Sequence, residues 1–294
     1  MDEWHVGDPA DWGDSVGVPD IPYMGYLQDN DDEDDEVPHA VAEGDSLRDR
    51  AWDLRNAGNL NYALNTINEA LEWDGNWRNY NVKAIILEDM NRLDEALSCY
   101  DMALAQTNDP VVKDNKARLL SSIARYRTTD NQEALDLINQ ALKLISNDDD
   151  RCSFLHVKRS ILESMGRKRD AYVCNKLANR QPERVDEFEK QSEILKRITD
   201  TLICISATSF YDNFTPFKKG VTIDLVKEPE NEHDSNAIRV EVNGKTVGYV
   251  ANSSYTLIDE VSSATDIKNK FEDRTKAKVL FIYMERYVIA KLLS

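Results

Sequence analysis

An internal repeat between residues 46 and 200 limits the possible folds of this chain more than any other feature. Pairs of alanines seven residues apart occur four times, with steps of 33, 38 and 37 residues between successive pairs. The pairs are Ala63/Ala70, Ala96/Ala103, Ala134/Ala141 and Ala171/Ala178. Periods of about 20–50 residues are typical of solenoids, in which each repeat packs only against its neighbours. The segment is therefore predicted to be a stack of helix pairs rather than one globular core.

A short polar segment precedes each alanine pair and contains residues that favour a turn. The four segments begin at Gly58, Asn91, Asp130 and Gly166. Glycine and asparagine adopt positive φ readily, so they end one helix and let a second begin. Alanine lets two helices cross closely, and larger residues between the alanines, such as Ile67 and Tyr100, are expected to fill the groove of the neighbouring repeat.

The repeat resembles the tetratricopeptide repeat family, whose period is about 34 residues. The resemblance is closest over Gly58–Asp74 and Asn91–Leu104, whereas the third and fourth repeats are longer. It implies a helical solenoid of four repeats over residues 46–200, with Glu183–Thr199 as a capping helix and a concave groove for a protein partner. Trp52 stands where a clamp for chaperone tails would need asparagine, so the partner stays unidentified.

Residues 201–294 change from helical to alternating periodicity. Six segments alternate apolar and polar residues, as half-buried strands do. They cover 202–207, 221–226, 237–242, 246–250, 277–283 and 287–293. Asn243-Gly244 predicts a two-residue hairpin, and residues 252–263 are expected to form a helix capped by Asn252 or Ser253. Six strands with one helical insert favour a small closed β-barrel.

The negative charge of the chain is concentrated at its N-terminus. Residues 1–45 contain fifteen Asp or Glu and no Lys or Arg, so the other 249 residues carry only −3 of the total charge of −18. The almost unbroken acidic run Asp29–Glu36 repels itself and stays solvated, which predicts a disordered tail. Trp4 and Trp12 within it indicate a short docking motif, or else they are incidental to a solubilising tail.

Several functional classes find no support in the residues. The acidic start Met1–His5 argues against a signal peptide, and no run of about 18 apolar residues predicts a transmembrane helix, so we expect a cytoplasmic protein without a membrane partner. The four cysteines are too far apart for paired zinc ligands, and neither a metal nor a cofactor is predicted. Gly244-Lys245-Thr246 lacks the first glycine of a phosphate-binding loop, and no histidine is placed to activate a nucleophile. We therefore expect that the protein is not an enzyme.

The stretch Leu225–Val240 carries the most informative motif. It reads Leu-Val-Lys-Glu-Pro-Glu-Asn-Glu-His-Asp-Ser-Asn-Ala-Ile-Arg-Val, which predicts a strand, a polar turn and a second strand, and Gly248-Tyr-Val-Ala-Asn252 follows. These residues resemble the signature of the HIRAN domain family, and the resemblance covers residues 201–294. It implies a small OB-like barrel. HIRAN domains of replication-fork remodelling enzymes bind the 3′ end of single-stranded DNA.

By this resemblance, the pocket for the strand end is built from aromatic residues ahead of the second strand and from the polar turn. An aromatic face stacks a terminal base, a carboxylate accepts the terminal sugar hydroxyl, and nearby lysines hold phosphates. The corresponding residues are Phe210 and Tyr211 for stacking, Asn231, His233, Asp234 and Asn236 for the turn, and Lys218, Lys219 and Lys227 for the phosphates. Ser209 and His233 depart from the basic residue and the tyrosine that fork remodellers carry.

The charge of the predicted barrel leaves more than one function open. Residues 201–294 contain 12 Lys or Arg against 13 Asp or Glu, so nucleic-acid binding is expected to be weak and salt-sensitive. Asp234 and Asn236 would alternatively only cap the turn through backbone amides. The leading prediction is a non-enzymatic adaptor that binds a protein through its repeats and a single-stranded DNA or RNA end through its barrel.

Two further hypotheses compete with it. In the first, the chain is a protein-only scaffold whose barrel does not bind nucleic acid. In the second, the acidic tail makes an intramolecular contact, folding back onto the barrel or the groove as a nucleic-acid mimic. Tethering raises the effective concentration of such a tail to about the mM range.

Overall fold

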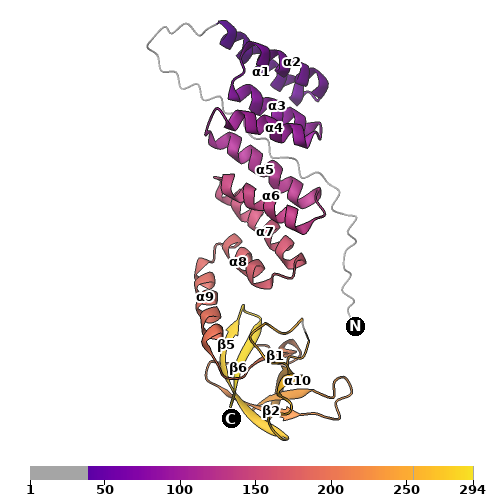
Figure 1. The fold of residues 1–294 in the computed structure, drawn as a ribbon, viewed down its shortest axis with the longest axis vertical. Coiled ribbons are helices and arrows are strands. Elements are labelled where there is room, and N and C mark those ends of the chain that lie inside the picture. The colour runs from indigo at the N-terminus through magenta and orange to yellow at the C-terminus, as the bar shows by residue number, and fades with distance from the viewer. Residues whose placement is uncertain (1–38, 254, 294) are drawn as a thin grey trace.

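The computed structural model describes residues 39–253 and 255–293, which form a helical stack followed by a β-barrel (Figure 1). This order confirms the predicted α-then-β architecture. The segment 1–38, and with it most of the predicted tail, lies outside the described residues. Within the two described ranges, no helix combines the length and the apolar character needed to cross a membrane.

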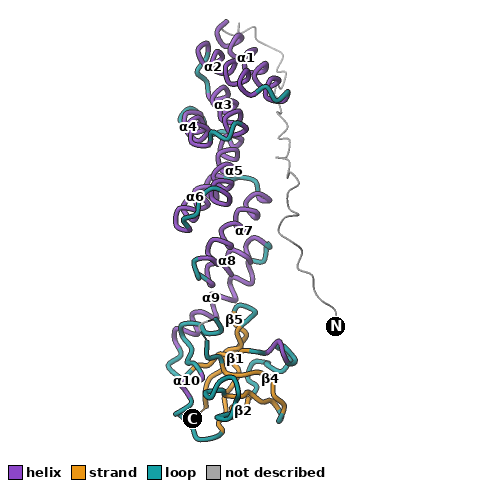
Figure 2. Tube along the Cα trace, turned by 90° about the vertical axis from the view of Figure 1, so that its right-hand side faces the viewer, coloured by secondary structure: helices purple, strands orange, loops and turns teal. Residues whose placement is uncertain are grey.

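Four helix pairs and a single last helix stack along the long axis of the molecule (Figure 2). The pairs are α1 (His39–Asn56) with α2 (Leu60–Trp73), α3 (Trp77–Asp89) with α4 (Leu93–Leu104), α5 (Pro110–Tyr126) with α6 (Asn131–Leu144), and α7 (Asp148–Ser164) with α8 (Lys168–Ala178). The last helix is α9 (Pro182–Arg197), at the position expected for the capping helix. The predicted repeat solenoid is therefore confirmed.

The repeated alanines explain how the helix pairs pack. All eight lie on the second helix of a pair, and none is more than 6% exposed. Ile67, between the first two alanines, is fully buried in a cluster that includes Val82 and Ile86 of the following pair. Tyr100 occupies the same place in the second pair and packs with Val112 and Leu119 of the third. Each core cluster thus joins a repeat to the next one.

The turns inside the pairs use the residues that the sequence indicated. Gly58, Asn91 and Gly166 all have positive φ, between 58° and 76°. The third pair has no such residue. There Asp130 caps α6, because its Oδ1 accepts hydrogen bonds from the backbone N of Gln132 at 2.7 Å and of Glu133 at 2.9 Å.

The first helix begins earlier than the acidic composition suggested. Residues 39–45, predicted as the end of a disordered tail, form the first turns of α1, so this part of the predicted boundary is wrong. The reason is packing: Gly44 is buried against α2, and a Cβ on it would lie 3.0 Å from the Cβ of Asp74. The nearby acids Glu43 and Asp45 remain compatible with a helix because they pair with His39 and Arg48.

Six antiparallel strands close into a barrel in the order β1-β4-β3-β2-β5-β6, with β6 pairing back onto β1. They are β1 (Leu202–Ser206), β2 (Thr222–Lys227), β3 (Ile238–Val242), β4 (Lys245–Val250), β5 (Arg274–Tyr283) and β6 (Tyr287–Leu293). Asn243 and Gly244 both have positive φ, which confirms the predicted two-residue hairpin. The barrel interior is one cluster of buried apolar residues drawn from all six strands.

The predicted helix over residues 252–263 is wrong. Its described residues run as a loop against the solenoid, and only the short α10 (Ala264–Ile267) follows, capped by Ser263. Leu257, Ile258 and Val261 have helical spacing, but they use it to pack into the cluster between solenoid and barrel. Backbone groups at the end of the loop bond to the barrel instead of to a helix, for instance the N of Ser262 to the carbonyl of Leu202 at 2.8 Å.

Solenoid and barrel share this apolar cluster, which lies between α8, α9 and strands β1, β5 and β6 (Figure 1). The ring of Phe188 on α9 stacks on that of Tyr283 on β5 with 5.3 Å between centroids. The hydroxyl of Tyr283 lies 2.8 Å from the Oγ of Ser192. Ion pairs from Arg169 to Glu260 and from Lys176 to Glu285 flank the stack. The two parts are therefore packed together rather than joined by a free linker.

Candidate functional site

In the polar turn, residues 228–236 between β2 and β3, side-chain oxygens accept hydrogen bonds from several backbone N–H groups. The Oδ1 of Asn231 accepts hydrogen bonds from the backbone N of His233 at 3.0 Å and of Asp234 at 3.2 Å. The Oδ1 of Asp234 in turn accepts from the backbone N of Asn236 at 2.8 Å. Such Asx bonds fix a loop without secondary structure. The turn-capping role considered for Asp234 is thus present, whereas Asn236 acts through its backbone N.

Residues from the loop after β4 and from α10 and its end anchor the turn. The second carboxylate oxygen of Asp234 accepts from the Nδ2 of Asn252 at 2.8 Å, and the Oδ1 of Asn252 accepts from the backbone N and Oγ1 of Thr265 at 3.1 and 2.9 Å. The ammonium of Lys268 donates to the Oδ1 of Asn236. Hydrogen bonds from Asn236 and Asn252 lower the pKa of Asp234, so its carboxylate is ionised near neutral pH.

The predicted aromatic residues lie close to the start of the polar turn. They belong to the single 3₁₀ turn Thr208–Phe210 and the residue after it, and the Phe210 side chain is 85% exposed while Tyr211 is 37% exposed. Strand register places the end of β1 level with the end of β2: Ser206 pairs with Tyr249, Tyr249 with Arg239, and Arg239 with Val226. The Glu228 carboxylate at the start of the polar turn and the Tyr211 hydroxyl both lie beside Tyr249, so the aromatic loop and the turn meet there.

Tyr249 on β4 connects these two parts and was not among the predicted residues. Burial raises its pKa to about 12, and the Glu228 carboxylate and the Tyr211 hydroxyl beside it act in the same direction. Gly248 makes this arrangement possible, because a Cβ there would lie 2.7 Å from the backbone oxygen of Ser206. Both Gly248 and Tyr249 belong to the Gly248–Asn252 motif of the sequence, which could have indicated their place in the site.

An ion-pair network covers the outside of β3 next to the turn. Arg239 pairs with Glu228 and with Glu241, the latter at 2.9 Å. Glu241 also pairs with Arg274 of β5 at 3.2 Å. Glu228 further accepts from the Nδ2 of Asn231 at 3.0 Å, which ties the network to the polar turn.

The three predicted phosphate-binding lysines do not lie at the polar turn as free groups. Lys227 is next to it, but its ammonium donates to the backbone oxygen of Phe271 at 2.6 Å and lies 5.0 Å from the Phe271 ring centroid. Lys218 and Lys219 precede the start of β2, whereas the turn follows its end, and six strand residues span about 20 Å. Lys218 and Lys219 therefore lie apart from the polar turn, and phosphate binding by the three lysines stays a prediction.

The polar turn itself carries negative charge. Residues 228–234 contain Glu228, Glu230, Glu232 and Asp234 and no Lys or Arg, and the side chain of His233 is exposed. Only Glu228 among these acids forms an ion pair, with Arg239, while Asp234 has the Lys268 ammonium nearby. The structure thus unites the turn residues with the aromatic loop, but in an acidic rather than a basic environment. Among the described residues, no group of three His, Cys, Asp or Glu is placed to hold a metal ion.

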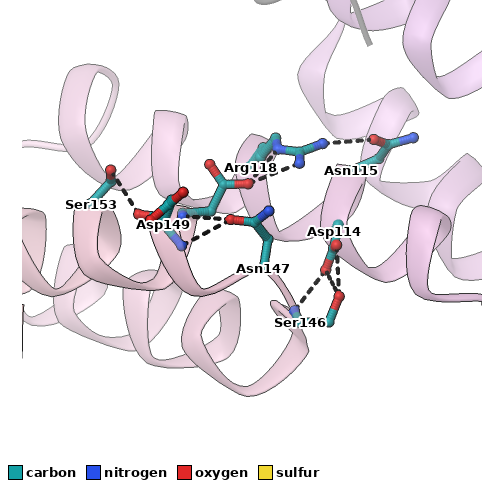
Figure 3. A network of polar contacts seen from close by, with 8 residues as sticks. Asp114, Asn115, Arg118, Ser146, Asn147, Asp149 and Ser153 are labelled. Carbon is teal, nitrogen blue, oxygen red and sulfur yellow. Dashed lines mark hydrogen bonds and ion pairs between the residues drawn. The ribbon is translucent and has the colours of Figure 1, made fainter. Parts of the chain in front are cut away.

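A second polar network lies on the first helices of the repeats (Figure 3). Arg118 of α5 donates to the Oδ2 of Asp150 on α7 at 3.0 and 2.8 Å. It also donates to Asn115 at 3.3 Å, and Asn115 donates to Asn81 of α3 at 3.2 Å. Because α1 contacts α3 and α5 contacts α7, these first helices share one side of the solenoid. That side is the candidate surface for a protein partner.

Comparison with known proteins gives a match in the barrel and likeness in the solenoid. Residues 200–267, which include the polar turn and the aromatic loop, match the HIRAN domain family. Solved structures similar to the helical part include MamA 41-end from Desulfovibrio magneticus RS-1 (13% identity, 48% of this chain and 76% of that chain, TM-score 0.35). A second is pilF from Pseudomonas aeruginosa (18% identity, 52% of this chain and 71% of that chain, TM-score 0.34). A third is YrrB, a TPR protein with an unusual peptide-binding site (18% identity, 47% of this chain and 68% of that chain, TM-score 0.35). A search of curated proteins gave no match.

Proposed function

We propose that this chain, in which a HIRAN domain follows tetratricopeptide-type repeats, is a non-enzymatic adaptor that binds a protein through its repeats and the 3′ end of a single-stranded nucleic acid through its barrel. The HIRAN match suggests nucleic-acid binding in general, and recognition of the 3′ end is the specific part of the proposal. The observation that carries it is the ionised carboxylate of Asp234, fixed in a turn that meets the loop of the exposed Phe210 at Tyr249.

The geometry of Asp234 suits a terminal hydroxyl. Each of its two oxygens accepts one bond within the protein, and an ionised carboxylate offers about four acceptor sites, so two remain for a ligand. A free 3′-hydroxyl can donate to such an oxygen, whereas a 3′-phosphate brings like charge against it. The exposed Phe210 ring offers a stacking surface, and such stacking contributes about 1–3 kcal/mol per base.

The proposed protein partner binds on the side of the solenoid that carries the Asn81–Asn115–Arg118 network. With Asp150, these side chains are already oriented by bonds between three successive repeats, so a partner would lose little entropy in ordering them. A polar surface of this kind favours an extended peptide with hydrogen-bonding groups. The proposal includes no chemical step, because both ligands are held and not transformed.

The test is fluorescence anisotropy with labelled single-stranded oligonucleotides at low salt, in DNA and RNA form. Oligonucleotides with a free 3′-hydroxyl are compared with ones that end in a 3′-phosphate. Wild type should prefer the hydroxyl, and Asp234→Asn should lose about tenfold in affinity for it, since a hydrogen bond to a charged group contributes about 1.5–3 kcal/mol. Asparagine keeps the oxygen that caps the turn but loses the acceptor of the Asn252 bond, so a thermal melt of the variant checks that the fold persists.

Glu272→Gln is the matched control, because it removes one negative charge from an exposed position of the same barrel outside the polar turn. It should leave the preference for the hydroxyl unchanged. Equal affinity of the wild type for both ends, or equal effects of the two substitutions, would contradict end recognition by Asp234.

A protein-only scaffold remains the second candidate function, and the acidic turn favours it. Four acids in residues 228–234 that form a single ion pair repel a phosphate backbone. The same turn suits a basic peptide. Binding of neither DNA nor RNA in the anisotropy experiment, together with capture of a basic peptide that is lost in Asp234→Asn, would establish this function in place of the first.

A further inference from the structure

Four lysines gather on the outside of the barrel at the end of β2 opposite to the polar turn. We propose that this lysine face, made of Lys218, Lys219, Lys276 and Lys278, holds the phosphates of the nucleic-acid strand whose end lies at the polar turn. The inference rests on the proposed function and adds the path of the strand across the protein. It keeps Lys218 and Lys219 as phosphate ligands, as expected from the sequence, and places them apart from the polar turn.

Strand alternation points two of these lysines outward. Ala277 and Val279 belong to the buried core of the barrel, so Lys276 and Lys278 on either side of Ala277 extend into solvent, and both are exposed. The loop with Lys218 and Lys219 lies against the same strand, because the backbone N of Gly220 donates to the carbonyl of Val279 at 2.8 Å. The four lysines therefore form one surface across β5 and the start of β2.

The ammonium groups of the lysine face are available for a ligand. In the described part of the chain, none of the four makes a hydrogen bond or an ion pair, although Asp224 lies opposite Lys276 in the sheet. Lys278 stands directly opposite Lys291, and like charges at such positions destabilise a sheet. Lys291 is compensated by Asp200 at 3.0 Å, whereas Lys278 is not. A bound anion would relieve this repulsion.

The other cations near the polar turn are already occupied. Lys227 donates to Phe271, Lys268 to Asn236, and both Arg239 and Arg274 pair with Glu241. Although the barrel has a net charge of −1, its charge is therefore divided along β2, with acids at the end of the strand and free lysines at its start. A phosphate backbone is repelled from the first region and attracted to the second.

The division of charge sets a direction for the bound strand. On β5, Arg274 is opposite Val226 near the polar turn, and Lys276 and Lys278 follow at steps of about 7 Å toward the start of β2. A strand whose uncharged terminal hydroxyl sits at Asp234 would pass along this row, with its charged phosphates leaving the acidic turn. The 3′ end and the backbone would then be bound by two separate surfaces.

The experiment measures binding of single-stranded DNA to the full chain over a range of salt concentrations. The main variant is Lys218→Gln/Lys219→Gln/Lys276→Gln/Lys278→Gln, and the same four changes to arginine keep the charge. The control is Lys143→Gln/Lys190→Gln, at two exposed positions of the solenoid. The probes carry a free 3′-hydroxyl and have about 4 and about 16 nucleotides, the range of sites on OB-type barrels.

For the longer probe, each lost phosphate contact should lower the slope of log affinity against log salt by about 0.7, so the glutamine variant should lose up to about 3 in slope. The arginine variant and the solenoid control should keep the wild-type slope. The short probe, which can contact fewer of the four lysines, should lose less slope in the glutamine variant and retain its preference for the hydroxyl over a 3′-phosphate.

Separate results distinguish this inference from the proposed function. An unchanged salt slope in the glutamine variant, with end preference intact, would overturn the lysine face as the path of the strand and leave the proposed function standing. A reduced slope without any end preference would support the lysine face and overturn end recognition. Failure of the wild type to bind either probe would overturn both.

Discussion

The solenoid and the barrel are stabilised in different ways within one chain. In the solenoid, separate apolar clusters each join a helix pair to the next, so contacts remain local along the sequence. In the barrel, one cluster draws on all six strands, and the first strand pairs with the last. A solenoid of this kind loses stability repeat by repeat, whereas a closed barrel has no part that can open without breaking the ring.

Matched leucines test this difference with the largest expected effect. Leu162 on α7 and Leu225 on β2 are both completely buried, one in a solenoid cluster and the other in the barrel core. Truncating either to alanine should cost about 2–5 kcal/mol in the free energy of unfolding. In the solenoid, only the repeats next to Leu162 should lose stability. In the barrel, all six strands should lose it together, because they form one closed sheet.

Native-state hydrogen exchange checks this prediction. Leu162→Ala should reduce protection in α6, α7 and α8 while α2 stays near its wild-type level. Leu225→Ala should reduce protection in all six strands together and leave α2 to α6 unchanged. Equal loss of protection across the whole chain in Leu162→Ala would show that the shared cluster at Phe188 and Tyr283 makes the two parts one cooperative unit.

The same locality decides how much of the fold could be predicted. The alanine pairs and the turn glycines report on helices a few residues away, so the four repeats followed from the sequence. The loop at residues 252–263 did not, because the partners of Leu257 and Ser262 lie in the solenoid and on β1. The start of α1 was also missed. The acidic residues predicted a disordered segment there, and the packing of Gly44 against α2 cannot be read from the sequence.

The candidate site divides in a similar way. Asn231, Asp234 and Asn236 could be predicted as a group because Asx bonds act within two or three residues. Lys268 was missed since its contact with Asn236 spans 32 residues. Lys227 was assigned to phosphates on the strength of its neighbours in sequence, but its side chain turns toward the backbone of Phe271. Sequence adjacency gives no direction for a long side chain.

Two carboxyl groups give the solenoid and the barrel opposite responses to pH. Burial raises the pKa of Glu88 from 4.5 to about 7, although a hydrogen bond from Tyr100 acts against it. The folded state therefore holds its proton more tightly than the unfolded chain does, so stability is lost as pH rises from about 4.5 to 7. The loss above pH 7 is roughly 3 kcal/mol. Asp234 has a lowered pKa, so its contribution is lost only as pH falls through that pKa.

Chemical denaturation at several pH values tests the larger effect. Glu88→Gln should stabilise the solenoid at pH 8 and make no difference at pH 4, because glutamine cannot ionise but still accepts from Tyr100. Glu72→Gln is the control, because it removes the same charge from an exposed position of the solenoid that forms no ion pair among the described residues. A stabilisation by Glu88→Gln that is independent of pH would contradict the raised pKa.

Helix caps provide the smallest and most specific contrast. Asp130 caps α6 in the solenoid, and Ser263 caps α10 in the barrel through a reciprocal pair of bonds with Asp266. Replacing either cap by alanine should cost about 1 kcal/mol in stability. Only Ser263→Ala should also weaken oligonucleotide binding, because α10 carries Thr265, which holds the Asn252 partner of Asp234.

Anisotropy and thermal melts of the same samples separate the two effects. Asp130→Ala should lower the melting temperature without changing affinity for the 3′-hydroxyl probe. Ser263→Ala should reduce that affinity several-fold, and Ser263→Thr, which keeps a capping hydroxyl, should restore it. If both alanine variants changed affinity equally, the effect would come from overall stability, and α10 would have no role in positioning the polar turn. If only Ser263→Ala lowered the affinity, the Ser263 cap would position the Asp234 carboxylate from outside the turn. The link would be the hydrogen bonds from Thr265 to Asn252 and from Asn252 to Asp234.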